Sequence, residues 1–148
     1  MKKYDVLESL KEAIESRLFS LQSELDEILN TMANDTKSTA GDKHETSRAM
    51  AQLEQEKLGK QISETRKFLQ TFSSISNTKS GAEIQIGSLI ETSSGFFLLG
   101  IAYGQLTVQN ESVFCLSTAA PLGQLLLGKL VGDEVLLNGR RFEILGVE

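Results

Sequence analysis

Eight apolar residues near the start of the chain recur at intervals of three and four, and this spacing constrains the fold more than any other feature. They are Leu7, Leu10, Ile14, Leu18, Leu21, Leu25, Ile28 and Met32. Residues three and four apart lie on one face of an α-helix, so the spacing predicts a long helix with a narrow apolar stripe. From Leu18 to Met32 the stripe follows an unbroken heptad pattern, which is typical of a coiled coil.

A second stripe of the same kind follows after a segment of small and polar residues. It consists of Leu53, Leu58, Ile62, Leu69 and Phe72, with polar Thr65 where an apolar residue is expected. The intervening residues 34–41 are rich in Asn, Asp, Ser, Thr and Gly, and they predict a turn. Two narrow stripes joined by a short turn bury each other, so this part is predicted to be an antiparallel helical hairpin.

The composition changes near Ser80. Residues 1–79 contain 12 Lys/Arg and 13 Asp/Glu, whereas residues 80–148 contain 3 and 7, together with ten of the 12 glycines and the single proline. Short β-type runs bounded by glycine predict strands at 83–91, 96–101, 105–108, 113–116, 134–137 and 141–147. A short helix is predicted from Pro121 to Gly128, because proline favours the first turn and glycine the end. The Asn138-Gly139 pair favours a hairpin turn.

These patterns together predict an α+β fold. It comprises an N-terminal antiparallel α-helical coiled-coil hairpin and a small antiparallel β-sheet domain with one short helix. We place the hairpin in residues 1–75 with its turn at about 34–42, a linker in 76–82 and the sheet domain in 83–148.

Charge and cysteine content exclude several classes of function. The formal net charge of −5 argues against a large surface that neutralises nucleic-acid phosphates. One cysteine permits neither an intrachain disulfide framework nor a multi-cysteine metal site. No apolar run approaches the roughly 18 residues of a membrane span, so we expect a cytoplasmic protein with no membrane partner.

The C-terminal part resembles a known protein family. Residues 117–135 contain Pro121-Leu-Gly, Leu126-Leu-Gly-Lys and Val131-Gly-Asp, and the run 142–145 reads Phe-Glu-Ile-Leu. This series is similar to the C-terminal domain of the Gre transcript-cleavage factors of bacteria, and the match extends back to 86–90. In the turn segment that family has a Gly-Asp-x-x-Glu-Asn-Ala-Glu-Tyr-like sequence. Here Gly41, Asp42 and Glu45 match it, Thr46 replaces the Asn, and the Ala-Glu-Tyr portion is lost.

The resemblance implies an FKBP-like fold for residues 83–148 and a defined role for the hairpin. In the Gre family the hairpin enters the secondary channel of RNA polymerase, and acids at its tip assist hydrolysis of backtracked RNA. Carried over by position, the catalytic residues are Asp42 and Glu45. They would hold Mg²⁺ jointly with the polymerase active site, with no metal expected in the free protein. The implied partners are RNA polymerase and the 3′ end of the nascent RNA. The chain would then be a monomeric accessory factor and not a free-standing enzyme.

Other interpretations of the candidate residues stay open at this point. An Asp-x-x-Glu sequence opening a helix is also a capping box, which satisfies backbone N–H groups without any ligand. His44 could be a third ligand or a proton shuttle, but a lone exposed histidine in a turn is more often simply solvated. Asp35 is a weaker candidate, because turn residues before a helix are commonly Asp for local hydrogen bonding. Cys115 is expected to be a small buried apolar residue. Glycines 123, 128 and 132 are interpreted as turn and cap residues, because no Gly-Lys-Ser/Thr motif accompanies them.

Two other functions compete with transcript cleavage. The first is a regulator that occupies the polymerase channel without cleaving RNA, such as a DksA-like protein or an inhibitor homologous to Gre factors. The altered residues after Glu45 favour this alternative, whereas the retained pair of acids disfavours it. The second is an FKBP-like chaperone or prolyl isomerase, which ranks below both.

Overall fold

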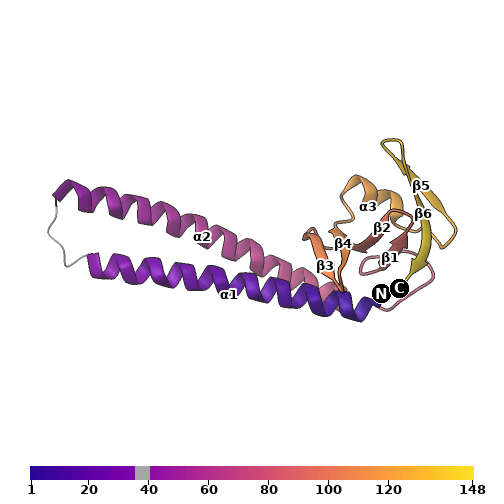
Figure 1. Ribbon diagram of the computed structural model, residues 1–148, viewed down its shortest axis with the longest axis horizontal. Coiled ribbons are helices and arrows are strands. Elements are labelled where there is room, and N and C mark those ends of the chain that lie inside the picture. Colours follow the sequence, from indigo (N-terminus) through magenta and orange to yellow (C-terminus); the bar gives the residue numbers. More distant parts are fainter. Residues whose placement is uncertain (36–40) are drawn as a thin grey trace. The chain divides into compact units, whose positions relative to one another are not determined.

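The computed structural model describes the backbone of residues 1–35 and 41–148, and the side chains of residues 1–34 and 45–148 (Figure 1). Two long helices come first, α1 (Lys3–Asp35) and α2 (Gly41–Ser76), as the apolar stripes predict. The helices extend further toward each other than expected. Residues 34, 35, 41 and 42 of the predicted turn are helical, and its remainder lies outside the described residues.

The chain forms two compact units, and each long helix contributes to both. One unit comprises Met1–Glu12 with Phe68–Glu148, and the other, which we call the helical unit, comprises Ala13–Lys67. In the helical unit the two helices share an apolar cluster of Leu21, Leu58 and Ile62. Leu18, Leu25 and Ile28 pack against this cluster, so α1 presents the predicted stripe to α2.

One assignment to the second stripe is wrong, because Leu53 is 66% exposed. Leu53 and Leu58 are five positions apart, and in an α-helix this spacing rotates a side chain well off the face shared by residues three or four apart. Thr65, by contrast, belongs to the buried face and is 1% exposed. Its hydroxyl donates a hydrogen bond of 2.7 Å to the carbonyl oxygen of Gln61, which satisfies the buried polar group within the helix.

All the strands and the short helix lie in the other unit, which we call the sheet unit. In chain order they are β1 (Leu89–Thr92), β2 (Gly95–Leu99), β3 (Gly104–Val108), β4 (Glu111–Leu116), α3 (Pro121–Leu126), β5 (Glu134–Leu137) and β6 (Arg140–Val147). The strands form one sheet in the order β3-β4-β2-β1-β6-β5. Each predicted element from residue 96 onward is present, and the Asn138-Gly139 turn joins β5 to β6 with positive φ angles of 51° and 78°.

The prediction of an antiparallel sheet is wrong at one pair of strands. β2 and β4 run parallel, with Phe96 opposite Val113 and Leu98 opposite Cys115. The hairpin of β3 and β4 causes this, because β3 lies at the sheet edge and β4 is inserted between β3 and β2. Alternating apolar residues indicate which face of a strand is buried, but they do not determine the direction of its neighbour.

The strand predicted at 83–91 is also shorter than expected, because β1 begins at Leu89. Before it, Glu83 forms only an isolated bridge to Leu130. The chain then turns at Gly87, whose φ of 90° favours glycine. A Cβ at this residue would lie 1.9 Å from the Thr78 hydroxyl oxygen, so both the turn and the close approach require glycine.

One apolar cluster of the sheet unit joins α3 to one face of the sheet. We call it the α3 cluster; it consists of Ile84, Ile90, Leu99, Leu116, Leu126, Val135, Phe142 and Ile144. Gly123 allows α3 to approach the preceding segment, because a Cβ there would lie 2.1 Å from the Ser117 carbonyl oxygen. The interpretation of Gly123 as a turn or cap residue is therefore wrong, because it lies inside α3 and has a packing role, whereas Gly128 and Gly132 lie in turns after the helix with φ angles of 83° and 93°.

The ends of the long helices that belong to the sheet unit contact residues outside its strands. The Lys3 ammonium group donates to the carbonyl oxygen of Thr78 at 3.2 Å, and the Lys3 backbone N–H donates to Glu148 Oε2 at 3.0 Å. The Phe68 and Tyr103 rings meet edge to face with centroids 5.5 Å apart. Among the helices of the described residues, none is long and apolar enough to cross a membrane.

Candidate functional site

The two acids predicted to be catalytic both belong to the beginning of α2. The helix starts at Gly41, which places Asp42 in its first turn and Glu45 in its second. Residues three apart in a helix are neighbours on one face, so the backbone brings these two positions together. The Glu45 side chain is exposed, whereas the side chains of Asp42 and His44 lie outside the described residues.

The chemistry available at this helix start is that of hard oxygen ligands. The N-terminus of a helix favours negatively charged side chains through the helix dipole. Mg²⁺ accepts one or two protein carboxylates and completes an octahedral shell with waters or phosphate oxygens. Two acids therefore fit an ion held mostly by another molecule. Elsewhere, within the described side chains, no three His, Cys, Asp or Glu residues gather closely enough to hold a metal ion.

The helical environment around Glu45 is polar and open. Arg48 follows one turn later and is exposed, as are the residues between them. Asp35 is the last residue of α1, and its side chain lies outside the described residues. The expectation that Asp35 is a turn residue is wrong for its backbone, because α1 extends through it.

Cys115 is buried, as its place in an apolar run predicts. Its side chain is 1% exposed on β4, and burial raises the pKa of the thiol to about 12. A thiol is reactive only as the thiolate, and at neutral pH this cysteine is protonated. Its place beside Leu98 of β2 is that of a small apolar core residue.

Sequence reasoning missed the buried amine of Lys3, which is only 7% exposed. Burial lowers the pKa of its ammonium group, and the negative charge of Glu148 partly opposes this effect. The residues next to Lys3 in the sequence do not distinguish a buried lysine at a helix start from a solvent-exposed one. The contact with Thr78, 75 residues away, becomes apparent only in the folded chain.

Comparison of the chain with models of protein families, with curated proteins and with solved structures gives no match.

Proposed function

We propose that this chain is an accessory factor of bacterial RNA polymerase, similar to the Gre transcript-cleavage factors. The observation that carries the proposal is the series Pro121-Leu-Gly, Leu126-Leu-Gly-Lys and Val131-Gly-Asp, which surrounds α3 in the sheet unit. The order of two long helices followed by a sheet with one short helix is compatible with that family. In the proposal the helices form a coiled-coil hairpin, and residues 83–148 have an FKBP-like fold.

In the proposed mechanism the polymerase active centre hydrolyses the RNA, and the hairpin positions two acids at that centre. The hairpin enters the secondary channel and brings the start of α2 to the polymerase active centre. There Asp42 and Glu45 supply two carboxylates, and the polymerase acids, water and RNA supply the other ligands. Asp42 and Glu45 would help to hold Mg²⁺, which would supply an activated water and stabilisation of the charge that develops when a phosphodiester is hydrolysed. Exposure of Glu45 supports this role, because a ligand for a shared ion must be accessible.

RNA cleavage in artificially backtracked polymerase complexes tests the proposal. We expect the wild-type chain to accelerate cleavage, and Asp42→Ala with Glu45→Ala to abolish the acceleration without weakening binding to the polymerase. The matched control is Glu54→Ala with Glu56→Ala, which removes two exposed acids further along α2 and should leave cleavage intact. Cleavage that survives the change at Asp42 and Glu45 would exclude these acids from the mechanism.

A channel regulator that does not cleave RNA is the second candidate. Thr46 and the residues after it differ from the family sequence, and this difference favours the alternative. The same assay separates the two candidates. Binding of the wild-type chain to the polymerase without any gain in cleavage would support the regulator and contradict transcript cleavage.

A further inference from the structure

A groove of about 410 Å³ lies between α1 and α2 in the helical unit. Three residues of each helix line it: Gln22, Leu25 and Asp26 of α1, and Gly59, Ile62 and Arg66 of α2. Leu25 and Ile62 give it an apolar floor, because both take part in the apolar cluster that the helices share. Asp26 is the lining residue furthest along α1, and Arg66 is the one furthest along α2. The helices run in opposite directions (Figure 1), so these two charges lie at opposite ends of the groove.

Within the described residues, nothing requires a glycine at residue 59. Gly59 lies in the middle of α2, where glycine is less favourable than alanine. Its φ is not positive, so the backbone conformation suits any residue. Apart from its immediate neighbours and the local helix backbone, no atom lies within 4 Å of the position that a Cβ would take. A glycine of this kind leaves open space on the helix surface and permits the close approach of another molecule.

The exposed ring of Phe19 borders the same groove. Phe19 lies three positions before Gln22 and seven before Asp26, and this spacing puts all three on one side of α1. Its side chain is 73% exposed, more than any other large apolar side chain of the described residues. One side of the helical unit therefore carries both an exposed aromatic ring and an open space over Gly59, which are the knob and the hole of helix packing.

The two charges make this side complementary to itself. Asp26 and Arg66 are exposed, and neither forms an ion pair with another described residue. A two-fold axis through the groove exchanges its two ends and sets α1 of one copy against α2 of the other, so that Asp26 faces Arg66. Phe19 lies seven positions before Asp26, and Gly59 lies seven before Arg66. The facing helices run parallel, so the same operation places Phe19 of one copy over Gly59 of the other.

We propose that two copies of this chain form a two-fold symmetric dimer through this side, with Phe19 of each copy over Gly59 of the other and Asp26 paired with Arg66. A side with one acid, one base and an apolar groove matches its own copy better than a uniformly charged ligand such as a nucleic acid. The contact extends over about two turns of each helix, which is small for a specific interface, so we expect a dissociation constant of about 10–100 µM.

This assembly differs from the monomer that the Gre resemblance implies. It does not rest on the proposed function, since it involves neither RNA polymerase nor the start of α2.

Sedimentation equilibrium of the full chain over a range of concentrations measures the association. Gly59→Leu fills the groove and Phe19→Ala removes the ring, so each should weaken the dimer at least about tenfold. Both changes favour helix formation, and circular dichroism should show that the helices are retained. Ser20→Leu is the matched control. It adds leucine at an exposed residue two positions from Gln22, on the opposite side of α1, and should leave the dissociation constant unchanged.

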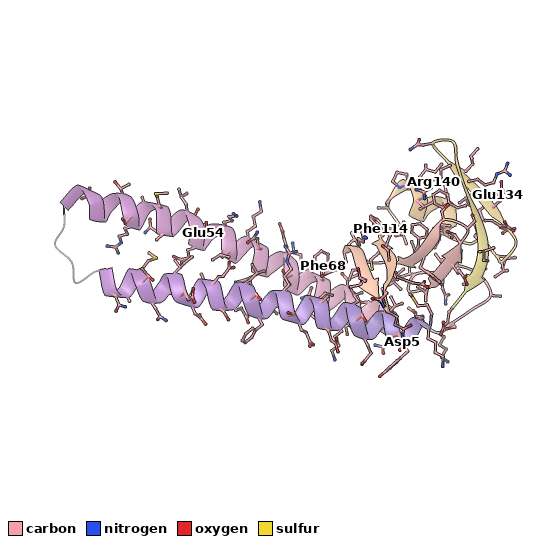
Figure 2. All side chains as sticks on the ribbon, in the orientation of Figure 1. Asp5, Glu54, Phe68, Phe114, Glu134 and Arg140 are labelled. Carbon is pink, nitrogen blue, oxygen red and sulfur yellow. The ribbon has the colours of Figure 1, made fainter. Side chains whose placement is uncertain are left out.

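An exchange of charges tests the two-fold pairing itself. Asp26→Arg and Arg66→Asp should each prevent dimerisation, because like charges then face each other. An equimolar mixture of the two variants should dimerise, since a heterodimer contains two restored ion pairs. The control is Glu54→Arg, at an exposed acid of the same unit that Figure 2 labels. Glu54 lies five positions from Gly59 and therefore off its side of α2, so this change should not affect the dimer.

Three results would overturn the proposal. The first is a chain that stays monomeric up to about ten times the expected dissociation constant. The second is a dimer that Gly59→Leu or the single charge variants leave intact, which would assign the association to another surface. The third is a mixture of the two charge variants that stays monomeric while the wild type dimerises.

Discussion

A methyl group added at Gly123 should destabilise the sheet unit. The new Cβ would lie 2.1 Å from the Ser117 carbonyl oxygen, whereas ordinary contacts begin at 3.4 Å, so α3 or the preceding segment must move by about 1.3 Å. That carbonyl also accepts the Ala120 N–H at 3.2 Å, and losing such a bond costs about 1 kcal/mol. Overpacking against a buried helix adds about 1–3 kcal/mol. Alanine has a better helix propensity than glycine, and this offsets up to about 1 kcal/mol of the cost. We therefore expect the free energy of unfolding to fall by about 1–3 kcal/mol.

Urea unfolding followed by tyrosine fluorescence measures this loss. The chain has two tyrosines and no tryptophan, and both Tyr4 and Tyr103 belong to the sheet unit. With an m-value of about 1–3 kcal/mol per molar urea, the midpoint of Gly123→Ala should fall by about 1 M.

Gly59→Ala is the matched control, because nothing lies within 4 Å of its Cβ position in α2. It should raise helix stability by about 0.5–1 kcal/mol, detected by circular dichroism. An unchanged midpoint for Gly123→Ala would refute the close approach of α3 to Ser117.

Three further results are expected. Thr65→Val should change the free energy of unfolding by less than about 1 kcal/mol, because the hydroxyl and its Gln61 bond are lost together; a loss above about 2 kcal/mol in urea unfolding would contradict this. Cys115 should resist iodoacetamide at about pH 8 in the folded chain and react in urea, as mass spectrometry would detect. Burial lowers the folded-state pKa of Lys3, so between that value and 10.5 the unfolded chain binds more protons and stability rises with pH. Lys3→Met should remove this rise in unfolding measured from about pH 8 to 11, and a persisting rise would assign it to another group.

The sequence predicts elements where one physical cause dominates. The stripe from Leu7 to Met32 requires a helix, and glycine-bounded runs require short strands. The prediction of an antiparallel sheet is wrong at β2 and β4, because strand direction depends on where β3 lies in the sheet, and no local pattern encodes that position. The prediction that Leu53 belongs to the second stripe is wrong, because Leu53 is apolar but its spacing from Leu58 does not fit one helix face.

The candidate site was predictable only in part, for a similar reason. The spacing of Asp42 and Glu45 indicates one helix face, and α2 includes both residues. By contrast, the β1–β6 pairing has a bulge between Glu91 and Thr92, and it places Gly146 opposite Glu91. No composition or spacing in the sequence signals such a contact between residues 55 positions apart.

The position of β6 has a consequence for the order in which the protein can fold during its synthesis. β6 lies between β1 and β5, and it contributes Phe142 and Ile144 to the α3 cluster. On a ribosome α1 and α2 emerge first, and helices form through local contacts. The sheet unit cannot complete its core until residues 140–147 have left the ribosome. Until then β1 has an unpaired edge, and such edges are prone to aggregation. The nascent chain therefore carries β1 to β4 without the partner strand of β1 until β6 has left the ribosome.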